Sequence, residues 1–253
     1  MSYSQETRPI SEDGLVAFKV GNNWGIKDAA GNVIVPAKYA SVYNFSEDVA
    51  AVNVGGKYRT VYDKRIDPLG HSWRIPREEF YGGKWGFINS RGEEILPCIY
   101  DDAKSFSEGL AAVKLRKSWS FIDKSGAVVI SGKYVSLESF SEGLAAVKLN
   151  KEYGFINKSG SLVIPCKYGE VSYFSEGLAA VATSATYTIK TKETKDYIRF
   201  YNGRKWGYID SKGVEVIPFE YVKTGPFKNG KAEVTNFAEE VFFINMQGKK
   251  IEN

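Results

Sequence analysis

The sequence predicts an all-β protein made of six tandem copies of one unit of about 34 residues. Two observations lead to this fold class. A Trp-Gly step, or a recognisable variant, recurs along the chain and is followed at fixed offsets by the same glycine, proline, tyrosine and phenylalanine. The segments between these positions have the length and composition of short strands bounded by turn residues. Each copy is therefore expected to be one small supersecondary element.

The fixed positions define the repeat. Its first position holds Trp24-Gly25, Trp85-Gly86 and Trp206-Gly207, with the variants Trp119-Ser120, Tyr153-Gly154 and Val241-Phe242. About seven residues later come the glycines Gly31, Gly92, Gly126, Gly160, Gly213 and Gly248. A tyrosine and then a phenylalanine follow in the first five copies: Tyr39 and Phe45, Tyr100 and Phe106, Tyr134 and Phe140, Tyr168 and Phe174, Tyr221 and Phe227. So many shared offsets indicate a true internal repeat.

Each unit contains three expected strands, here called segments A, B and C. They are typified by residues 110–115 (A), 85–89 (B) and 94–97 (C). Segments B and C are joined by Asn89-Ser90-Arg91-Gly92 and its equivalents, where Asn or Asp at the first position and Gly at the fourth are typical of a type I turn closed by a bulge. The proline that ends segment C removes a ladder donor. With the Tyr-to-Phe segment, the unit is an antiparallel β-meander of three to four strands.

This pattern resembles the bacterial WG-repeat family, whose unit is similar to Lys-Trp-Gly-Phe-Ile-Asn at residues 84–89 and Lys-Trp-Gly-Tyr-Ile-Asp at 205–210. The resemblance covers residues 11–253. The departures are Ser120 for Gly, Ser131 for Pro, Tyr153 for Trp, and Val241-Phe242 for Trp-Gly. The resemblance implies a binding or scaffolding role with no shared catalytic residues.

We expect one repeat domain over residues 1–253, with units near 11–46, 47–106, 107–140, 141–174, 175–227 and 228–253. A propeller-like ring is favoured over an open β-solenoid, because paired alanines recur in segment A and indicate crowded backbones. The segment from Tyr3 to Ile10 could complete the last unit and close the ring. A unit of about 34 residues is short beside the ~40–45 of known propeller blades, which favours the open stack.

Two insertions, at residues 53–83 and 183–204, fall between segments A and B. Insertions at the same point of a repeat emerge on the same edge, which is often the binding face. The second is predicted to be a lengthened hairpin, because apolar and polar residues alternate along it. The first has Gly55-Gly56 and Gly82-Gly83 at its base, and it could instead hold a decayed extra repeat, echoed by Tyr58, Tyr62 and Ile75.

The insertions carry the positive charge of the chain. Residues 53–83 hold six basic and four acidic side chains, and residues 183–204 hold five and two, whereas the whole chain has a net charge of +4. Like-signed arms would attract an acidic partner. The candidate contact residues are Arg65, His71, Trp73, Arg74, Lys190, Lys192 and Arg199. The aromatics Tyr58, Trp73, Tyr81, Tyr187, Tyr197 and Tyr201 could be contact anchors or could pack the arms, and solvated surface hairpins are the plain alternative.

Catalytic and metal-binding chemistry is not indicated. His71 is the single histidine, and no metal-ligand spacing, nucleophile elbow or phosphate loop occurs. Cys98 and Cys166 occupy equivalent positions of two units and are expected to be free, buried thiols. The recurrent Glu47, Glu108, Glu142 and Glu176 could pair for glycoside hydrolysis, but a residue present in nearly every unit is better explained as a structural acceptor in a turn.

The function expected from these observations is that of a non-enzymatic, cytoplasmic, monomeric module that binds a protein partner through the edge bearing the arms, without cofactors, metal, nucleic acid or membrane. An inhibitory or toxin-neutralising role would suit a small stand-alone binder. The alternative is a carbohydrate-binding or cell-envelope repeat protein, which would require exposed tryptophans and, in the full gene, a leader peptide.

Overall fold

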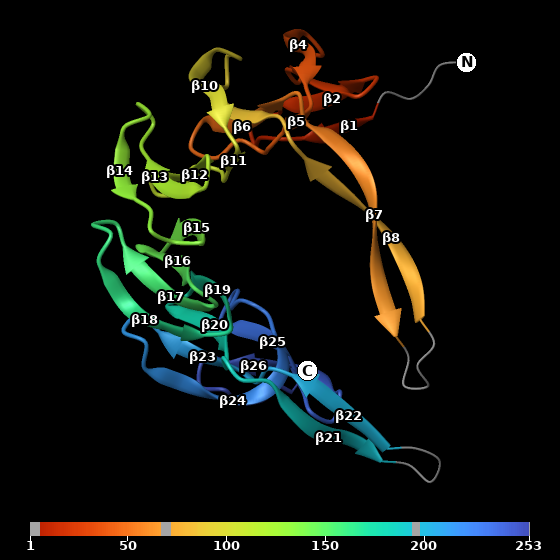
Figure 1. Cartoon of the computed structure of the whole chain (residues 1–253), viewed down its shortest axis with the longest axis vertical. Coiled ribbons are helices and arrows are strands. Elements are labelled where there is room, and N and C mark those ends of the chain that lie inside the picture. The colour runs from red at the N-terminus through yellow and green to blue at the C-terminus, as the bar shows by residue number, and fades with distance from the viewer. Residues whose placement is uncertain (1–5, 67–71, 194–197, 253) are drawn as a thin grey trace. The chain divides into compact units, whose positions relative to one another are not determined.

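The computed structural model describes residues 6–66, 72–193 and 198–252, and every regular element in them is a β-strand in an antiparallel sheet (Figure 1). Sheet 1 contains β1 (Thr7–Pro9), β2 (Val16–Val20), β3 (Asn23–Lys27) and β4 (Val33–Tyr39). Sheet 2 contains β5 (Ser41–Val42), β6 (Val49–Val54), β9 (Lys84–Asn89) and β10 (Glu94–Tyr100). In each, segments A, B and C pair in that order, as predicted. The expected end of segment C at its proline is wrong: β4 and β10 run on past Pro36 and Pro97 to the tyrosine, with a register shift where the proline lacks a donor.

The remaining repeats follow the same plan. Sheet 4 contains β15 (Ser136–Ser141), β16 (Leu144–Leu149), β17 (Glu152–Asn157) and β18 (Leu162–Tyr168). Sheet 5 contains β19 (Glu170–Ser175), β20 (Leu178–Ala182), β23 (Trp206–Asp210) and β24 (Glu215–Thr224). The same hydrogen-bonded sheet goes on from β24 to β25 (Lys231–Asn236) and β26 (Val241–Asn245), and we call this last part, the sixth repeat, sheet 6. The two insertions form separate ribbons, β7 (Lys57–Ile66) with β8 (Ser72–Tyr81) and β21 (Tyr187–Glu193) with β22 (Ile198–Gly203).

The chain divides into two compact units. Unit 1 comprises residues 1–117 and 123–127, and unit 2 comprises residues 118–122 and 128–253. The division runs through the third repeat, so that β11 (Asp102–Ala103) and β12 (Ala111–Leu115) belong to unit 1. The strands β13 (Ser118–Ile122) and β14 (Val128–Ser131) belong to unit 2.

The segment before segment A supplies a fourth strand to its own sheet. In sheets 2, 4 and 5 this strand is β5, β15 or β19, each paired with the A strand that follows it. Four antiparallel strands in sequence are the arrangement of a propeller blade, which confirms propeller-like repeats. One expectation is wrong: β1 pairs with β2, with Thr7 opposite Phe18, so the N-terminal segment completes the first sheet and not the last.

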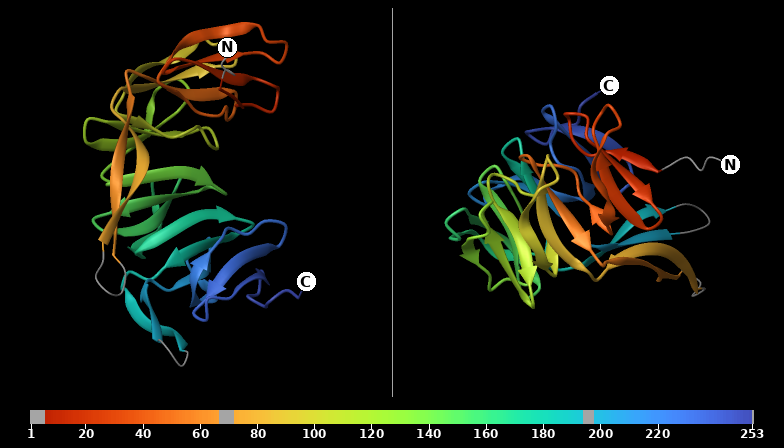
Figure 2. Two further views of the ribbon diagram at one scale, coloured as in Figure 1. Left: turned by 90° about the vertical axis from the view of Figure 1, so that its right-hand side faces the viewer. Right: turned by 90° about the horizontal axis from the view of Figure 1, so that it is seen from above.

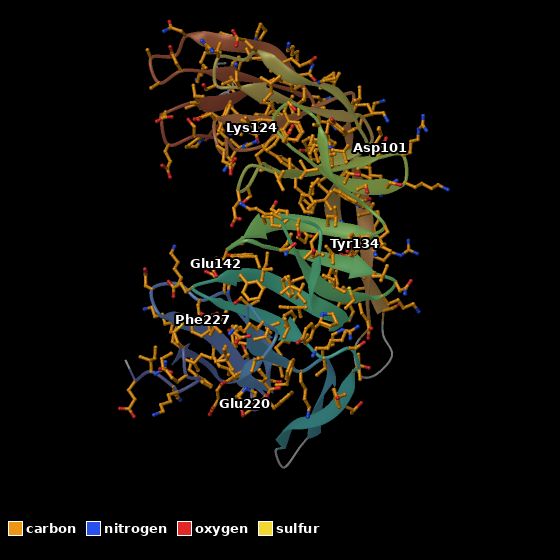
Figure 3. All side chains as sticks on the ribbon, turned by 90° about the vertical axis from the view of Figure 1, so that its left-hand side faces the viewer. Asp101, Lys124, Tyr134, Glu142, Glu220 and Phe227 are labelled. Carbon is orange, nitrogen blue, oxygen red and sulfur yellow. The ribbon has the colours of Figure 1, made fainter. Side chains whose placement is uncertain are left out.

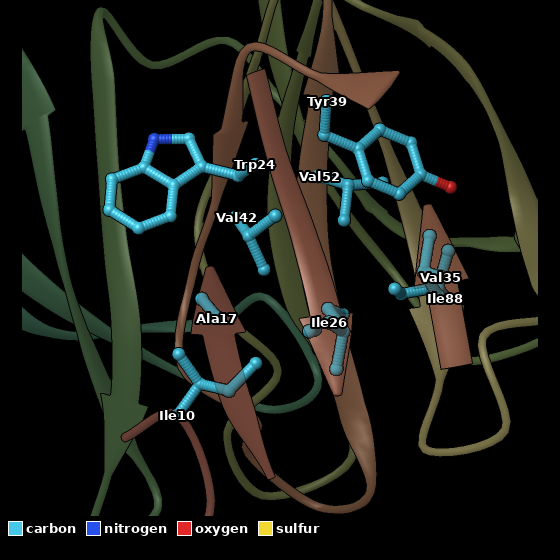
Figure 4. Close-up of a cluster of buried hydrophobic side chains, with 10 residues drawn as sticks. Ile10, Ala17, Trp24, Ile26, Val35, Tyr39, Val42, Val52 and Ile88 are labelled. Carbon is cyan, nitrogen blue, oxygen red and sulfur yellow. The ribbon is translucent and has the colours of Figure 1, made fainter. Parts of the chain in front are cut away.

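The hydrophobic core lies between neighbouring sheets. One cluster joins side chains of sheets 1 and 2, among them Trp24, Ile26, Tyr39 and Val52 (Figure 4). Two further clusters in unit 2 join sheet 4 to sheet 5 and sheet 5 to sheet 6. A single repeat therefore buries its apolar face only against the next one, as expected of a repeat protein. Cys98 and Cys166 are free, as predicted, but only half-buried, and burial raises the pKa of both thiols.

The glycine of the Trp-Gly step makes room for segment C. A Cβ atom on Gly154 would lie 2.4 Å from the carbonyl oxygen of Ile164, and one on Gly86 would lie 2.7 Å from that of Leu96. Segment C bulges toward segment B at this point, as the register shifts between β17 and β18 show. Any side chain at the second position of the motif would therefore push segment C off its sheet.

The departures from the motif follow from the same contact. In the third repeat Ser120 replaces the glycine of segment B, and the residue that must lack a side chain is instead Gly132, which follows segment C. A Cβ atom on Gly132 would lie 1.5 Å from the carbonyl oxygen of Trp119. In sheet 6, an isolated bridge between Ile244 and Lys250 stands where the other repeats have a longer segment C. Phe242 occupies the place of the glycine there, and its ring lies 6.4 Å from that of Tyr221.

Neighbouring repeats are also linked by the turn before segment A. The phenylalanine of this turn packs against the central aromatic of segment B in the preceding repeat, at 5.0 Å for Phe87–Phe106 and 4.9 Å for Phe155–Phe174. The serine that follows donates to a carbonyl of the next repeat's turn. Three such bonds, each 2.7 Å long, join Ser46 to Phe106, Ser141 to Phe174, and Ser175 to Phe227.

The recurrent glutamates complete this link. Glu142 accepts a hydrogen bond from the backbone N–H of Gly177, and Glu176 accepts from Asn229 and Gly230, so each carboxylate reaches the turn of the following repeat (Figure 3 labels Glu142). Each glutamate has a φ near +54°, a backbone conformation that residues other than Gly and Asn rarely adopt. Asn229, better suited to this φ, stands at the equivalent place in the last turn. The predicted structural acceptor is confirmed, and it acts between repeats.

Candidate partner-binding site

The connection between segments A and B differs sharply among the repeats. In sheet 4 it is the two residues Asn150-Lys151, with Asn150 at φ +56°. In sheets 2 and 5 the same connection is a β-hairpin, which we call the first arm (β7–β8) and the second arm (β21–β22) (Figure 2). Both insertions are therefore hairpins placed where the sequence predicted them. The first holds no decayed repeat, because its ladder runs without a register shift from Lys57–Tyr81 to Ile66–Ser72.

Charged side chains along the shaft of the first arm are paired with each other across the strands. The guanidinium of Arg59 lies 2.7 Å from the carboxylate of Glu79 and 4.7 Å from the centre of the Tyr81 ring. Arg77 pairs with Asp63 at 3.2 Å. The shaft is therefore close to neutral, although its composition is basic.

Basic residues stand close together in the ladder near the far end of the first arm. In the ladder Lys64 stands opposite Arg74, and Arg65 stands opposite Trp73. Like charges directly opposite each other destabilise a strand pair unless something else neutralises them. Three cations are thus concentrated at one end of the ribbon.

Large apolar side chains cover the shaft on both faces. Tyr58 and Tyr62 belong to one face and are 53% and 59% exposed. Trp73, Ile75 and Tyr81 belong to the other, with Trp73 49% exposed. Strand residues alternate between faces, so these side chains are divided between two faces, with Thr60 between the two tyrosines and with Arg77 and Glu79 between Ile75 and Tyr81. Exposed apolar side chains that gather on one element are typical of interaction sites.

A line of aromatic rings joins the first arm to the repeat body. The Tyr58 ring lies 5.0 Å from Phe80, Phe80 lies 5.8 Å from Trp85, and Trp85 lies 4.6 Å from Tyr43. Trp85 is the buried tryptophan of the repeat, whereas Tyr43 and Tyr58 reach the surface. Burial raises the pKa of the Tyr43 hydroxyl. The arm is thereby packed against its sheet on this side.

One buried amide fixes the base of the first arm. Asn53, with an exposed fraction of 0%, accepts a hydrogen bond from the N–H of Gly56 (2.9 Å) and donates to the carbonyl of Gly82 (3.3 Å). A Cβ atom on Gly56 or Gly83 would lie within 2.6 Å of its side-chain oxygen. The predicted bends at the glycine pairs are confirmed by positive φ values at Gly55, Gly82 and Gly83, and Asn53 explains why glycine is needed there.

The second arm is held at its base by Arg204. Its guanidinium donates to the carbonyl oxygens of Thr183 and Ser184 and lies 3.4 Å from Glu170. The Lys205 ammonium lies 4.7 Å from the centre of the Tyr187 ring. Arg204, counted among the basic residues of the insertion, therefore has a structural role. A register shift between Lys190 and Lys192 bends the ribbon.

The predicted contact residues fall into two groups. Trp73 and Arg74 are exposed on β8 near the tip of the first arm, beside Arg65 of β7 in the ladder. Lys192 stands opposite Arg199 in the second arm, and Lys190 stands opposite Phe200. The side chains of Arg65, Lys190, Lys192 and Arg199, and the whole of His71 and Tyr197, lie outside what is described. Tyr62 and Ile75, which are also exposed on the shaft, were not among the predicted contact residues.

The tryptophans bear on the carbohydrate alternative. Trp24, Trp85 and Trp119 are buried in the repeat cores, and Trp206 is partly buried. Buried rings cannot stack on sugars, so the repeated tryptophans serve packing. Trp73, on the first arm, is the exposed one.

The described residues hold no group of three or more His, Cys, Asp or Glu side chains placed to bind a metal ion. No helix of membrane-spanning length and apolarity occurs in the same residues.

Comparisons with known proteins bear on the repeat. The family model described as "WG containing repeat" matches residues 24–58, 85–119, 119–153, 153–183 and 206–236, together more than half of the chain. No curated protein matches the chain.

Solved structures of low identity align over most of the chain. Hsv2p of Kluyveromyces lactis is 9% identical, with a TM-score of 0.48, covering 95% of this chain and 74% of that one. BamB of Moraxella catarrhalis is 8% identical, with a TM-score of 0.45, covering 96% and 74%. The WD40 β-propeller domain of Doa1 is 10% identical, with a TM-score of 0.37, covering 94% and 78%.

Proposed function

This chain belongs to the family of WG-containing repeat proteins, and from that premise we propose that it is a non-catalytic module that binds a protein partner through the first arm. The repeats form the scaffold, and the arm is the contact element. The observation that carries the proposal is the presence of exposed aromatic rings on both faces of a ribbon whose shaft charges are already paired.

The energetics of a hairpin support this role. An isolated two-stranded ribbon is marginally stable because it has no core of its own. Leaving a large apolar side chain in water forgoes about 1.5–3 kcal/mol of burial energy. Tyrosine and tryptophan recover this energy at an interface, and their rigid rings lose little entropy on binding. A partner that covers Tyr62 and Trp73 would supply the missing core.

Charge at the tips favours an acidic partner. The first arm ends in Lys64, Arg65 and Arg74, and the second carries Lys190, Lys192 and Arg199. Cations at exposed tips accelerate the encounter with an acidic surface more than they strengthen the final complex. A module of this kind would inhibit its partner if the covered surface were a functional one.

Trimming the arm tests the proposal. Residues 55–83 are replaced by the two-residue turn Asn-Lys, which joins the equivalent strand ends in sheet 4. Wild type, trimmed protein and Trp73→Ser are used to capture partners from a native lysate. Val128→Ser, which alters an equally exposed apolar residue of the repeat body, serves as the control.

We expect one partner to be retained by wild type and by Val128→Ser, lost from the trimmed protein, and weakened about tenfold or more by Trp73→Ser, as for an interface hot spot. Raising the salt concentration should slow its capture, because salt screens exposed charges. Equal retention by the trimmed protein would place the site on the repeat body. Capture of polysaccharide in place of protein would refute the proposal.

A further inference from the structure

The edge strands of sheets 4 and 5 both carry a bulge. In β15, Leu137 pairs with Val147 and Phe140 with Ala145, so that Glu138 and Ser139 lie in the register shift between them. In β19 the shift covers Ser172 and Tyr173 in the same way. A bulge turns side chains out of the regular pleat and interrupts the ladder, and bulges are common beside binding sites.

Two adjoining hollows lie along these bulges, inside unit 2. The larger measures about 480 Å³ and is lined by Glu138 to Ser141, Leu144, Ala146 and Val171 to Tyr173. The smaller measures about 340 Å³ and is lined by Glu138, Tyr153, Glu170 and Val171. Glu138 and Val171 border both, so the hollows adjoin each other, and together we call them the groove. Its size suits a pair of side chains from an extended segment.

The bulged residues are the variable part of an otherwise constant turn. The pairs at this place are Tyr43-Asn44, Lys104-Ser105, Glu138-Ser139 and Ser172-Tyr173, and each is followed by a phenylalanine. Phe106, Phe140 and Phe174 are each 1% exposed. Packing thus determines the phenylalanine, whereas it leaves the preceding pair free to differ. Positions that differ between copies on a constant scaffold are those that can encode recognition.

The chemistry of the groove fits a cationic side chain. Its charged lining residues are Glu138 and Glu170, both acidic, and its floor is formed by Leu144, Ala146 and Val171. A lysine or arginine lays its aliphatic stem on an apolar floor while its head stays with carboxylates and aromatic rings.

The protein's own cations already use these groups. The Lys148 ammonium lies 4.6 Å from the centre of the Tyr153 ring, and Arg204 lies 3.4 Å from Glu170, whose side chain is still 59% exposed. The ring and the carboxylate are thus suited to cations, and a ligand's cation would share the exposed Glu170 carboxylate with Arg204 or take the place of Lys148 on the ring.

We propose that this groove is a second binding site, distinct from the arms, which takes an extended peptide segment bearing a lysine or arginine next to an apolar residue. The basic side chain lies against Glu138, Tyr153 and Glu170. The apolar side chain enters the larger hollow above Leu144 and Ala146. Charge complementarity makes the preference opposite to that of the arms, which favour an acidic surface.

The test titrates the full-length, ¹⁵N-labelled protein with the peptide acetyl-Leu-Arg-Leu-Arg-amide and, separately, with acetyl-Leu-Glu-Leu-Glu-amide. The basic peptide should shift amide signals of residues 136–141 and 170–173, and the acidic peptide should bind at least about tenfold more weakly. Glu138→Gln should weaken the basic peptide about tenfold, because a charge-assisted hydrogen bond is lost. Glu233→Gln, which removes one exposed carboxylate on β25, is the matched control and should change nothing.

Three outcomes would overturn the proposal. They are equal binding of both peptides, signal shifts confined to residues outside the groove, and unchanged binding after Glu138→Gln. The arm-trimmed protein must bind the basic peptide as wild type does. A loss of peptide binding there would assign the peptide to the arm, whereas a failed partner capture with intact peptide binding would refute only the function proposed for the arm.

Discussion

The same connection, between segments A and B, is a two-residue turn in sheet 4 and a long hairpin in sheet 2. The strands on either side have matching registers: Leu149 stands opposite Glu152 in one, and Val54 stands opposite Lys84 in the other. The sheet is therefore complete without the arm. The difference teaches that the sheet is the repeated structural unit of the body and that the arm is an added element with separate requirements.

The two regions also handle their apolar side chains in opposite ways. The repeat body buries tryptophan, tyrosine and phenylalanine between sheets and links the sheets by serine and glutamate. The arm leaves comparable rings in water. Perturbations that reach the interfaces between sheets should therefore unfold the body, whereas changes in the arm should alter binding and local order.

The largest expected effect is alkaline unfolding of the body. Burial raises the pKa of Tyr39 and of Tyr221 to about 12, and it raises that of Tyr208 as well. In the unfolded chain these hydroxyls ionise near pH 10. The free energy of unfolding that these protonated hydroxyls contribute should thus be fully present below pH 10 and be lost as the pH rises from 10 to 12. Urea unfolding midpoints measured at pH 8, 10, 11 and 12 check this, and a constant midpoint would contradict it.

The next largest effect concerns the Trp-Gly glycine. Gly154→Val should lower the free energy of unfolding by ~3–5 kcal/mol, because the new side chain meets the backbone of segment C. Gly177→Ala is the matched control: its φ is +82°, but nothing lies within 4 Å of the added Cβ atom. It should cost about 1 kcal/mol through backbone strain alone. Similar losses for the two variants would mean that close packing is not the reason for the motif.

A smaller and local effect is expected at the base of the arm. Asn53→Ala removes the hydrogen bonds to Gly56 and Gly82 and should lower the free energy of opening the arm by ~1–3 kcal/mol. Amide hydrogen exchange should accelerate in β7 and β8 while β16 and β17 keep their protection. Uniform acceleration in all four strands would show that the arm and the body unfold as one.

The smallest effect tests the link between repeats. Glu176→Ala loses two hydrogen bonds to the next turn, worth about 1 kcal/mol net, and leaves a β-carbon at a φ of +54°. Glu176→Gly loses the same bonds but removes the backbone strain. The thermal unfolding temperature of Glu176→Gly should therefore be higher than that of Glu176→Ala. The reverse order would mean that the strain at this position is not significant.

The repeat and its turns could be predicted because their signals are local. The offsets of the Trp-Gly step, and the Asn-to-Gly spacing of the turn at residues 89–92, report on residues close in sequence. The bond from Gly92 to Asn89 and the φ of +80° at Gly92 confirm that turn. The fourth strand was harder to see, because β5 is two residues long and β15 and β19 are bulged, which removes the alternation.

The site could be predicted only in outline, because its chemistry depends on partners distant in sequence. The composition of residues 53–83 indicates a basic arm, yet the register that pairs Arg59 with Glu79 and Arg77 with Asp63 neutralises its shaft. The reach of Glu176 to the turn of the next repeat is likewise invisible in the sequence. The assignment of the N-terminal segment to the last sheet failed for the same reason, since strand pairing is long-range.

The most direct test of the central claim is photo-crosslinking from the arm. A benzoylphenylalanine is placed at Tyr62, 59% exposed on the first arm, and in a second protein at Val128, 60% exposed on the repeat body. Each is irradiated in native lysate, and the covalent adducts are identified. The account predicts one dominant protein adduct from position 62 and none of that mass from position 128. The same adduct from position 128, with none from position 62, would contradict it.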